Sequence, residues 1–139
     1  MKILKVAFVL FCMTSITAYA LNDSFLKMVS TGGPRSLDEA FVLLEKTEGA
    51  EAENLTVAIG KSIVKSPKSF LKTVKKHKPT AKELNSIVAS FENSVTKDKD
   101  AQKKEVELRI ESLKSVSEQD LKIVRDQCIA TLEKKVKQL

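Results

Sequence analysis

The chain has 139 residues and a formal net charge of +6, from 24 Lys and Arg against 18 Asp and Glu. This length is enough for one domain with its own core. The sequence contains no Trp and one Tyr. Sites for carbohydrate or single-stranded nucleic acid commonly stack their ligands on these rings. The composition therefore disfavours a lectin, and we expect no nucleic-acid partner.

The beginning of the chain has the three parts of a secretory signal peptide. Two lysines come first, residues 6–16 are apolar, and positions 18–20 read Ala-Tyr-Ala. An apolar run this short does not cross a bilayer, which takes roughly 20 residues. We therefore predict that 1–20 is a signal peptide removed at export, rather than a retained anchor. Residues 21–139 then form one mature domain, periplasmic or secreted, with a mild net charge of +4 because two lysines leave.

After the signal peptide, apolar residues recur at the spacing of one helix face, and no stretch alternates as a half-buried strand does. The first predicted helix, 23–30, turns Met28 and Val29 inward and ends before a Gly-Gly-Pro sequence. Ser36 and Glu39 form a capping box that starts the second helix. The capping pattern fixes where this helix begins.

Start signals also define the later helices. Ser66 is expected to cap a helix, and it is followed by a proline, which suits a first helical position because its missing N–H costs no hydrogen bond there. Thr80 and Glu83 form a second capping box. Ser117 and Asp120 are expected to cap the last helix. The predicted helices after the first are, approximately, 37–46, 51–65, 67–77, 81–91, 100–116 and 121–136.

About six to seven short amphipathic helices define an all-α fold. Short links favour antiparallel hairpins. Shifting the sequence by 29 or 30 residues superposes apolar positions of successive helices. The hairpins are therefore either the repeats of a HEAT-like α-solenoid or parts of an ordinary helical bundle with chance matches.

Two segments, 66–71 and 121–128, read Ser-Pro-Lys-Ser-Phe-Leu and Leu-Lys-Ile-Val-Arg-Asp-Gln-Cys. In these segments the chain resembles small secreted bacterial all-helical proteins of undescribed function, whose paired helices are similar to HEAT and armadillo folds. The resemblance implies a helical fold over most of the mature chain. Its matching residues are mostly packing residues, so it implies no functional residue.

The strongest anomaly is a stretch without acidic residues between positions 53 and 83. Its lysines give the predicted helix 67–77 a wholly basic outer side. This side is either an ordinary solvated face or a docking face for an acidic protein surface or anionic envelope lipid. Lysine rather than arginine disfavours bidentate phosphate recognition. The candidate docking face consists of Lys61, Lys65, Lys68, Lys72, Lys75, Lys76, Lys78 and Lys82.

Other candidates for chemistry are few. His77 is the only histidine, and we interpret it as a surface residue at a helix end, because the local sequence supplies neither an orienting acceptor nor a nucleophile. Cys128 is the only cysteine of the mature chain, so no internal disulfide forms. It lies in an apolar stripe and is predicted to be a small core residue rather than a reactive thiol. Glu105, Glu107 and Glu111 are expected to form surface ion pairs with Lys103, Lys104 and Arg109, rather than a carboxylate dyad.

No catalytic, cofactor-binding or metal-binding pattern is present in the sequence, and no small-molecule substrate is indicated. We therefore expect an exported, non-catalytic helical protein-interaction module. A sharper alternative is an inhibitor or immunity protein that blocks an envelope-acting toxin or hydrolase. Another is an envelope-associated structural factor that binds anionic lipid. An enzyme would have to assemble its site from acidic residues or Cys128 in the folded chain.

Overall fold

The computed structural model describes residues 21–139, and the predicted signal peptide at 1–20 lies outside the described residues. Over 21–139 every regular element is a helix, which confirms the all-α prediction. The helices are α1 (Asp23–Ser30), α2 (Pro34–Leu44), α3 (Gly49–Lys65), α4 (Pro67–His77), α5 (Ala81–Val88), α6 (Asn93–Thr96), α7 (Lys99–Lys114), the 3₁₀ turn η1 (Gln119–Leu121) and α8 (Lys122–Val136).

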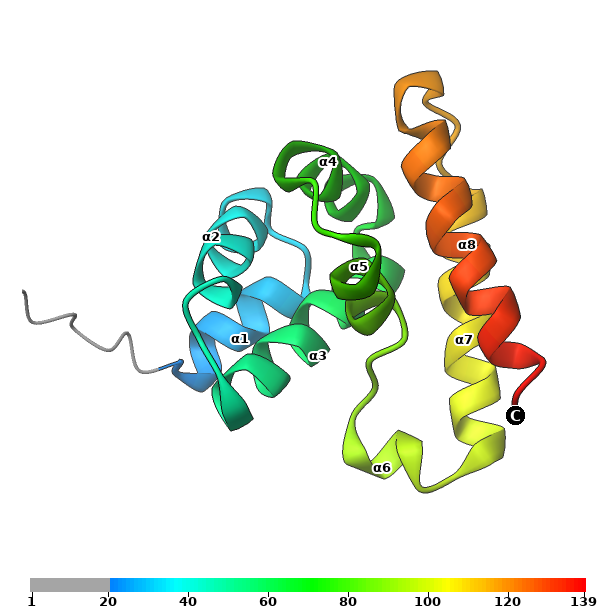
Figure 1. Cartoon of the computed structure of the whole chain (residues 1–139), viewed down its shortest axis with the longest axis horizontal. Coiled ribbons are helices and arrows are strands. Elements are labelled where there is room, and N and C mark those ends of the chain that lie inside the picture. Colours follow the sequence, from blue (N-terminus) through cyan, green and yellow to red (C-terminus); the bar gives the residue numbers. More distant parts are fainter. Residues whose placement is uncertain (1–20) are drawn as a thin grey trace, which may run out of the picture.

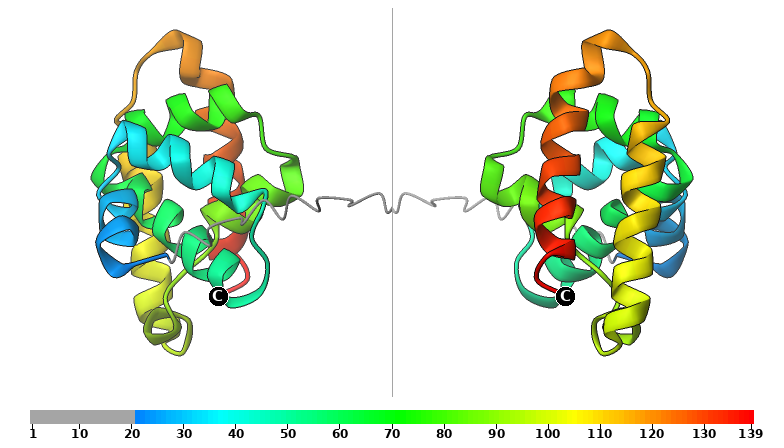
Figure 2. Two further views of the ribbon diagram at one scale, coloured as in Figure 1. Left: turned by 90° about the vertical axis from the view of Figure 1, so that its left-hand side faces the viewer. Right: turned by 90° about the vertical axis from the view of Figure 1, so that its right-hand side faces the viewer.

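Helix α3 lies at the centre of the described fold (Figure 1) and packs against α1, α2, α4, α5 and α7. Helices α7 and α8 form an antiparallel hairpin that lies beside α3, α4 and α5 (Figures 1 and 2). In a solenoid each repeat contacts only its neighbours. Helix α3 contacts α4, which follows it directly, and helices both before and after this pair, so the all-α arrangement fits a helical bundle and a solenoid of hairpins alike.

The apolar stripes of the helices meet in one core. Deleting a fully buried leucine or isoleucine side chain from such a core typically costs about 2–5 kcal/mol. Burial of these stripes therefore holds the helices together. The side chains with no exposed surface include Val29, Leu37, Leu55, Ile59, Ile63, Phe70, Leu71, Val88, Val106, Leu113, Cys128 and Leu132.

Two local start signals act as the sequence predicts. Pro67 is the first residue of α4. At the start of α5, the Thr80 N–H donates to Glu83 Oε2 (2.7 Å) and the Glu83 N–H donates to Thr80 Oγ1 (3.2 Å). These two bonds complete the predicted capping box and satisfy two N–H groups that have no partner within the helix.

Two predicted serine caps are wrong. Helix α2 begins at Pro34, not after Ser36, because the fixed φ of proline suits the first helical position and its N–H is not needed there. Ser66 does precede α4, but its side chain accepts no bond from that helix. Its Oγ instead donates to the Thr31 carbonyl (2.9 Å), which ties the start of α4 to the end of α1.

Three further expectations also need correction. Ser117 and Asp120 do not cap α8, because η1 leads directly into that helix. Met28 is 51% exposed rather than turned inward. The predicted helix 81–91 ends at Val88. The carbonyl of Val88 accepts a bond from the Arg109 side chain (2.8 Å) in place of a bond from a further helical turn.

Candidate docking face

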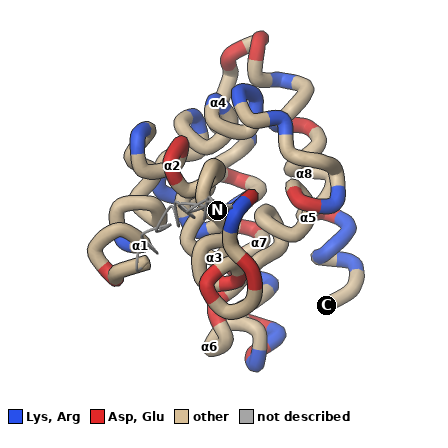
Figure 3. Tube along the Cα trace, turned by 60° about the vertical axis from the view of Figure 1, so that its left-hand side comes forward, with Lys and Arg blue, Asp and Glu red and all other residues tan. Residues whose placement is uncertain are grey.

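The lysines of the candidate docking face separate into two groups in the folded chain. Lys61 lies on α3 and lines a hollow together with Phe91 and Glu92. The other seven lie at the end of α3, along α4, and at the start of α5, where blue segments gather around α4 in Figure 3. All seven are exposed. We call this group the α4 lysine face, and it consists of Lys65, Lys68, Lys72, Lys75, Lys76, Lys78 and Lys82.

Carboxylates from other elements contact the α4 lysine face. On one side, Glu118 forms an ion pair with Lys68, and Asp120 Oδ2 lies 3.0 Å from Lys75 Nζ. On the other side, Asp38 Oδ1 on α2 lies 2.7 Å from Lys76 Nζ. The exposed residues of α4 itself are all lysines, as the sequence predicts, but the surface around them is not purely basic. The segment lacks acidic residues in sequence, but the fold places three of them beside it.

These ion pairs shift the pKa values of the groups involved. The hydrogen bond from Lys76, and then that from His77, lowers the pKa of Asp38. Hydrogen bonds from Lys68 and Lys75 likewise lower the pKa values of Glu118 and Asp120, with smaller contributions from Lys72. The bond to Glu118 raises the pKa of Lys68. All these carboxylates are thus held in the charged form at neutral pH.

A surplus of positive charge remains after this pairing. Seven lysines face three carboxylates, so the α4 lysine face has a formal charge of +4. Residues 21–139 contain 22 basic and 18 acidic residues, and removing this group leaves 15 of each. The whole net charge of the described chain is therefore concentrated here. Of the seven lysines of this face, Lys65, Lys72, Lys78 and Lys82 form no ion pair within residues 21–139.

His77 has an environment that the local sequence did not reveal. Its Nε2 lies 2.7 Å from Asp38 Oδ1, and its ring stacks on Phe41 with centroids 5.3 Å apart. The side chain is only 15% exposed, so the prediction of a surface residue is wrong, although it does end α4. Asp38, 39 positions away in the sequence, provides the carboxylate that the local sequence lacks. The pair joins α4 to α2.

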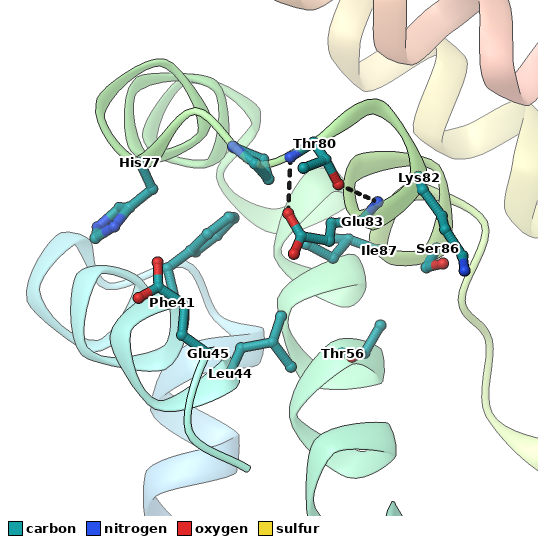
Figure 4. Close-up of a pocket in the computed structure, with 11 residues that line it drawn as sticks. Phe41, Leu44, Glu45, Thr56, His77, Thr80, Lys82, Glu83, Ser86 and Ile87 are labelled. Atoms are coloured by element: carbon teal, nitrogen blue, oxygen red, sulfur yellow. Dashed lines mark hydrogen bonds between the residues drawn. The ribbon is translucent and has the colours of Figure 1, made fainter. Parts of the chain in front are cut away.

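A cavity of about 400 Å³ opens next to His77, between α2, α3, α4 and α5 (Figure 4). Phe41, Leu44 and Ile87 supply its apolar surface, and the Phe41 ring points into it. Lys82 lies at its α5 side. The lining residues are Phe41, Leu44, Glu45, Thr56, His77, Pro79, Thr80, Lys82, Glu83, Ser86 and Ile87.

Cys128 is fully buried, as the sequence predicts, and burial raises the pKa of its thiol to about 12. A thiol with such a pKa has almost no thiolate at neutral pH, and the thiolate is the reactive form. The structure therefore favours a packing role for this cysteine.

Arg109 is the residue that sequence reasoning missed most clearly. Its ion pair with Glu105 is present (3.3 Å), but the arginine side chain is 1% exposed rather than on the surface. The guanidinium lies 4.5 Å from the Phe91 ring centroid, and burial lowers the pKa of Arg109. A Cβ on Gly60 would come within 3.0 Å of Arg109 Nη1. A glycine inside a predicted helix was the available signal, since it leaves room for a neighbouring side chain.

Within residues 21–139, no group of three or more His, Cys, Asp or Glu side chains is placed to hold a metal ion. None of the helices in this part of the chain combines the length and the apolar character that a membrane span needs. No family model, no curated protein and no solved structure matches the chain.

Proposed function

We propose that this protein is an exported, non-catalytic interaction module whose α4 lysine face docks on an acidic protein surface. The observation that supports this proposal is the concentration of the whole net charge of residues 21–139 on one exposed face. A face of one sign attracts surfaces of the opposite sign and raises the rate of encounter.

The ion pairs already present on the face do not oppose such docking. Their lysine side chains are exposed, with Lys68 at 53%, Lys75 at 49% and Lys76 at 65%. Exposed ion pairs contribute little net stability, since water and salt solvate the separated charges well. A carboxylate of the partner can therefore replace Glu118, Asp120 or Asp38 at small cost. Lys72, which has no ion pair within residues 21–139, is available directly.

An acidic protein fits this face better than a lipid surface does. The face is not purely basic, because three carboxylates lie along both edges of α4. A continuous anionic membrane surface would bring its negative charge against these carboxylates. A protein surface can instead place its carboxylates individually over the lysines that lack partners.

The first prediction tests the face by neutralising lysines that hold no ion pair, so that no carboxylate loses its partner. The variant Lys65→Gln, Lys72→Gln, Lys82→Gln should bind a fluorescent poly-glutamate peptide about tenfold or more weakly than the wild type in fluorescence anisotropy at low salt. Wild-type binding should weaken as salt rises, because exposed charges are screened over about 8–10 Å at 0.10–0.15 M salt.

The matched control removes the same number of charges elsewhere. Lys99, Lys103 and Lys104 are exposed on α7, and changing all three to Gln should leave the affinity within about twofold of the wild type. Equal weakening in both triple variants would show that only net charge matters and would reject the face. Stronger sedimentation with phosphatidylglycerol vesicles than binding to poly-glutamate would favour the lipid alternative instead.

A further inference from the structure

The cavity beside His77 lies where the α4 lysine face ends. His77 is the last residue of α4, Lys78 follows it, and Lys82 lines the cavity from α5. A volume of about 400 Å³ falls within the range of small-ligand sites, so it has room for one bulky side chain. A segment lying along α4 therefore reaches the cavity without leaving the lysine face.

The cavity has an apolar part that suits an apolar group. Phe41, Leu44, Pro79 and Ile87 form this part, beside seven polar lining residues, and Phe41 and Ile87 are almost fully buried. The nearest carboxylate on α5, Glu83, already accepts the Thr80 N–H of the capping box (2.7 Å). Apolar surface inside a concave site gains more from an apolar occupant than from water.

Lysine and carboxylate side chains both lie at the cavity, and their positions constrain how a charged segment can bind. Lys82 and Glu83 line it from α5, and Glu45 lines it from the end of α2 (Figure 4). Lys78 follows His77 at the end of α4. Glu45 forms no ion pair within residues 21–139. A bound segment is thus favoured with acidic residues over the lysines of α4 and with neutral residues at the cavity, where Glu45 and Glu83 lie.

We infer that the cavity receives one bulky apolar side chain of the partner, carried on a segment whose carboxylates lie along the α4 lysine face. This inference rests on the proposed function and specifies its partner as an acidic segment with a single apolar anchor. In protein interfaces a few residues, often aromatic side chains in enclosed pockets, supply most of the binding energy. The lysines would orient the segment, and the anchor would hold it.

The test uses the mature chain, 21–139, and two labelled peptides that differ at one residue. Each carries five glutamates on one side of a central residue and four neutral residues on the other, with phenylalanine or alanine at the centre, made in both chain directions. We expect the phenylalanine peptide to bind about tenfold more tightly than its alanine twin, as burial of an aromatic ring predicts. The methyl signals of Leu44 and Ile87 should shift in NMR spectra only with the phenylalanine peptide.

Ser86 offers a variant that fills the cavity without altering the core. It is exposed on α5 and lines the cavity. Ser86→Trp should abolish the advantage of phenylalanine while leaving the alanine peptide bound as before. Gln127→Trp, at an exposed position of α8 outside the cavity lining, should keep that advantage. Circular dichroism should show that both variants keep the helical fold.

The outcomes separate the two proposals. Equal affinity of the phenylalanine and alanine peptides, with both weakened by Lys65→Gln, Lys72→Gln, Lys82→Gln, would overturn the anchor cavity and leave the docking face standing. A phenylalanine advantage that survives Ser86→Trp would also overturn it. Failure of both peptides to bind the wild type would reject the docking face and the anchor cavity together.

Discussion

At the scale of single residues, Cys128 gives a direct test of how the core is built. Its side chain has no solvent-exposed surface and belongs to the same apolar core as Leu121 and Leu132. Native protein should therefore resist thiol reagents and react once it is unfolded in denaturant. Cys128→Ser should lower the free energy of unfolding by about 1–3 kcal/mol, because a buried hydroxyl without a partner is costly. Rapid labelling of the native thiol would contradict this placement.

The same residue predicts a loss of stability at alkaline pH. Burial raises the pKa of the Cys128 thiol from its ordinary value near 9 to about 12, so the folded chain favours the neutral thiol. The stability that the neutral thiol of Cys128 contributes is fully present below about pH 9 and is lost as the pH rises toward 12. Denaturant unfolding of the wild type and Cys128→Ala should therefore show a difference in stability that changes across this window. Cys128→Ala is the control, since the lysines that titrate in the same range are common to both. A constant difference would argue against burial of the thiol.

At the scale of elements, the sequence predicts best where a local signal is sufficient. The Thr80 and Glu83 capping box and Pro67 set helix starts through bonds and dihedral angles within a few residues. The short α6 and η1 lack a full period of apolar residues, so periodicity does not detect them. Ser66 shows the limit of local reading, because a distant carbonyl at Thr31 competes for its hydroxyl.

The contact between α2 and α4 carries the next prediction. Asp38 accepts bonds from both Lys76 and His77, and these bonds lower its pKa. A lowered pKa means that the charged carboxylate stabilises the fold above its ordinary pKa, near 4, and that this contribution is lost as the pH falls through the lowered value. Asp38→Asn should therefore be less stable than the wild type at pH 7 and indistinguishable from it in strong acid.

Glu39→Gln is the matched control for the contact between α2 and α4. It removes the same charge from the next residue of α2, where the carboxylate pairs only with Arg35 at an exposed position. Chemical denaturation followed by circular dichroism from pH 7 to pH 2 should show a smaller effect for this variant at neutral pH. Equal effects of the two substitutions would show that Asp38 acts through general charge and not through its contact with α4.

At the scale of the whole molecule, the candidate site was only partly predictable. The sequence located the lysines, because their excess over acidic residues is visible along the chain. It could not place Asp38 and Asp120 beside them, since those contacts join residues 38 and 45 positions apart. The cavity beside His77 was hidden for the same reason: four helices build it. Arg109 was placed on the surface because charged residues are seldom buried, and only the fold supplies its Val88, Glu105 and Phe91 contacts.

The last prediction concerns residues 21–139 as a unit. Residues 21–139 hold one cysteine, and it is buried in the core. The fold that the structure describes therefore contains no disulfide for a reductant to break, and its stability rests on apolar burial around α3. The chain 21–139, expressed without residues 1–20, should unfold cooperatively with the same thermal midpoint in the presence and absence of dithiothreitol. A midpoint that falls by several degrees with dithiothreitol would require a disulfide between two chains through Cys128, and with it an exposed position for that thiol.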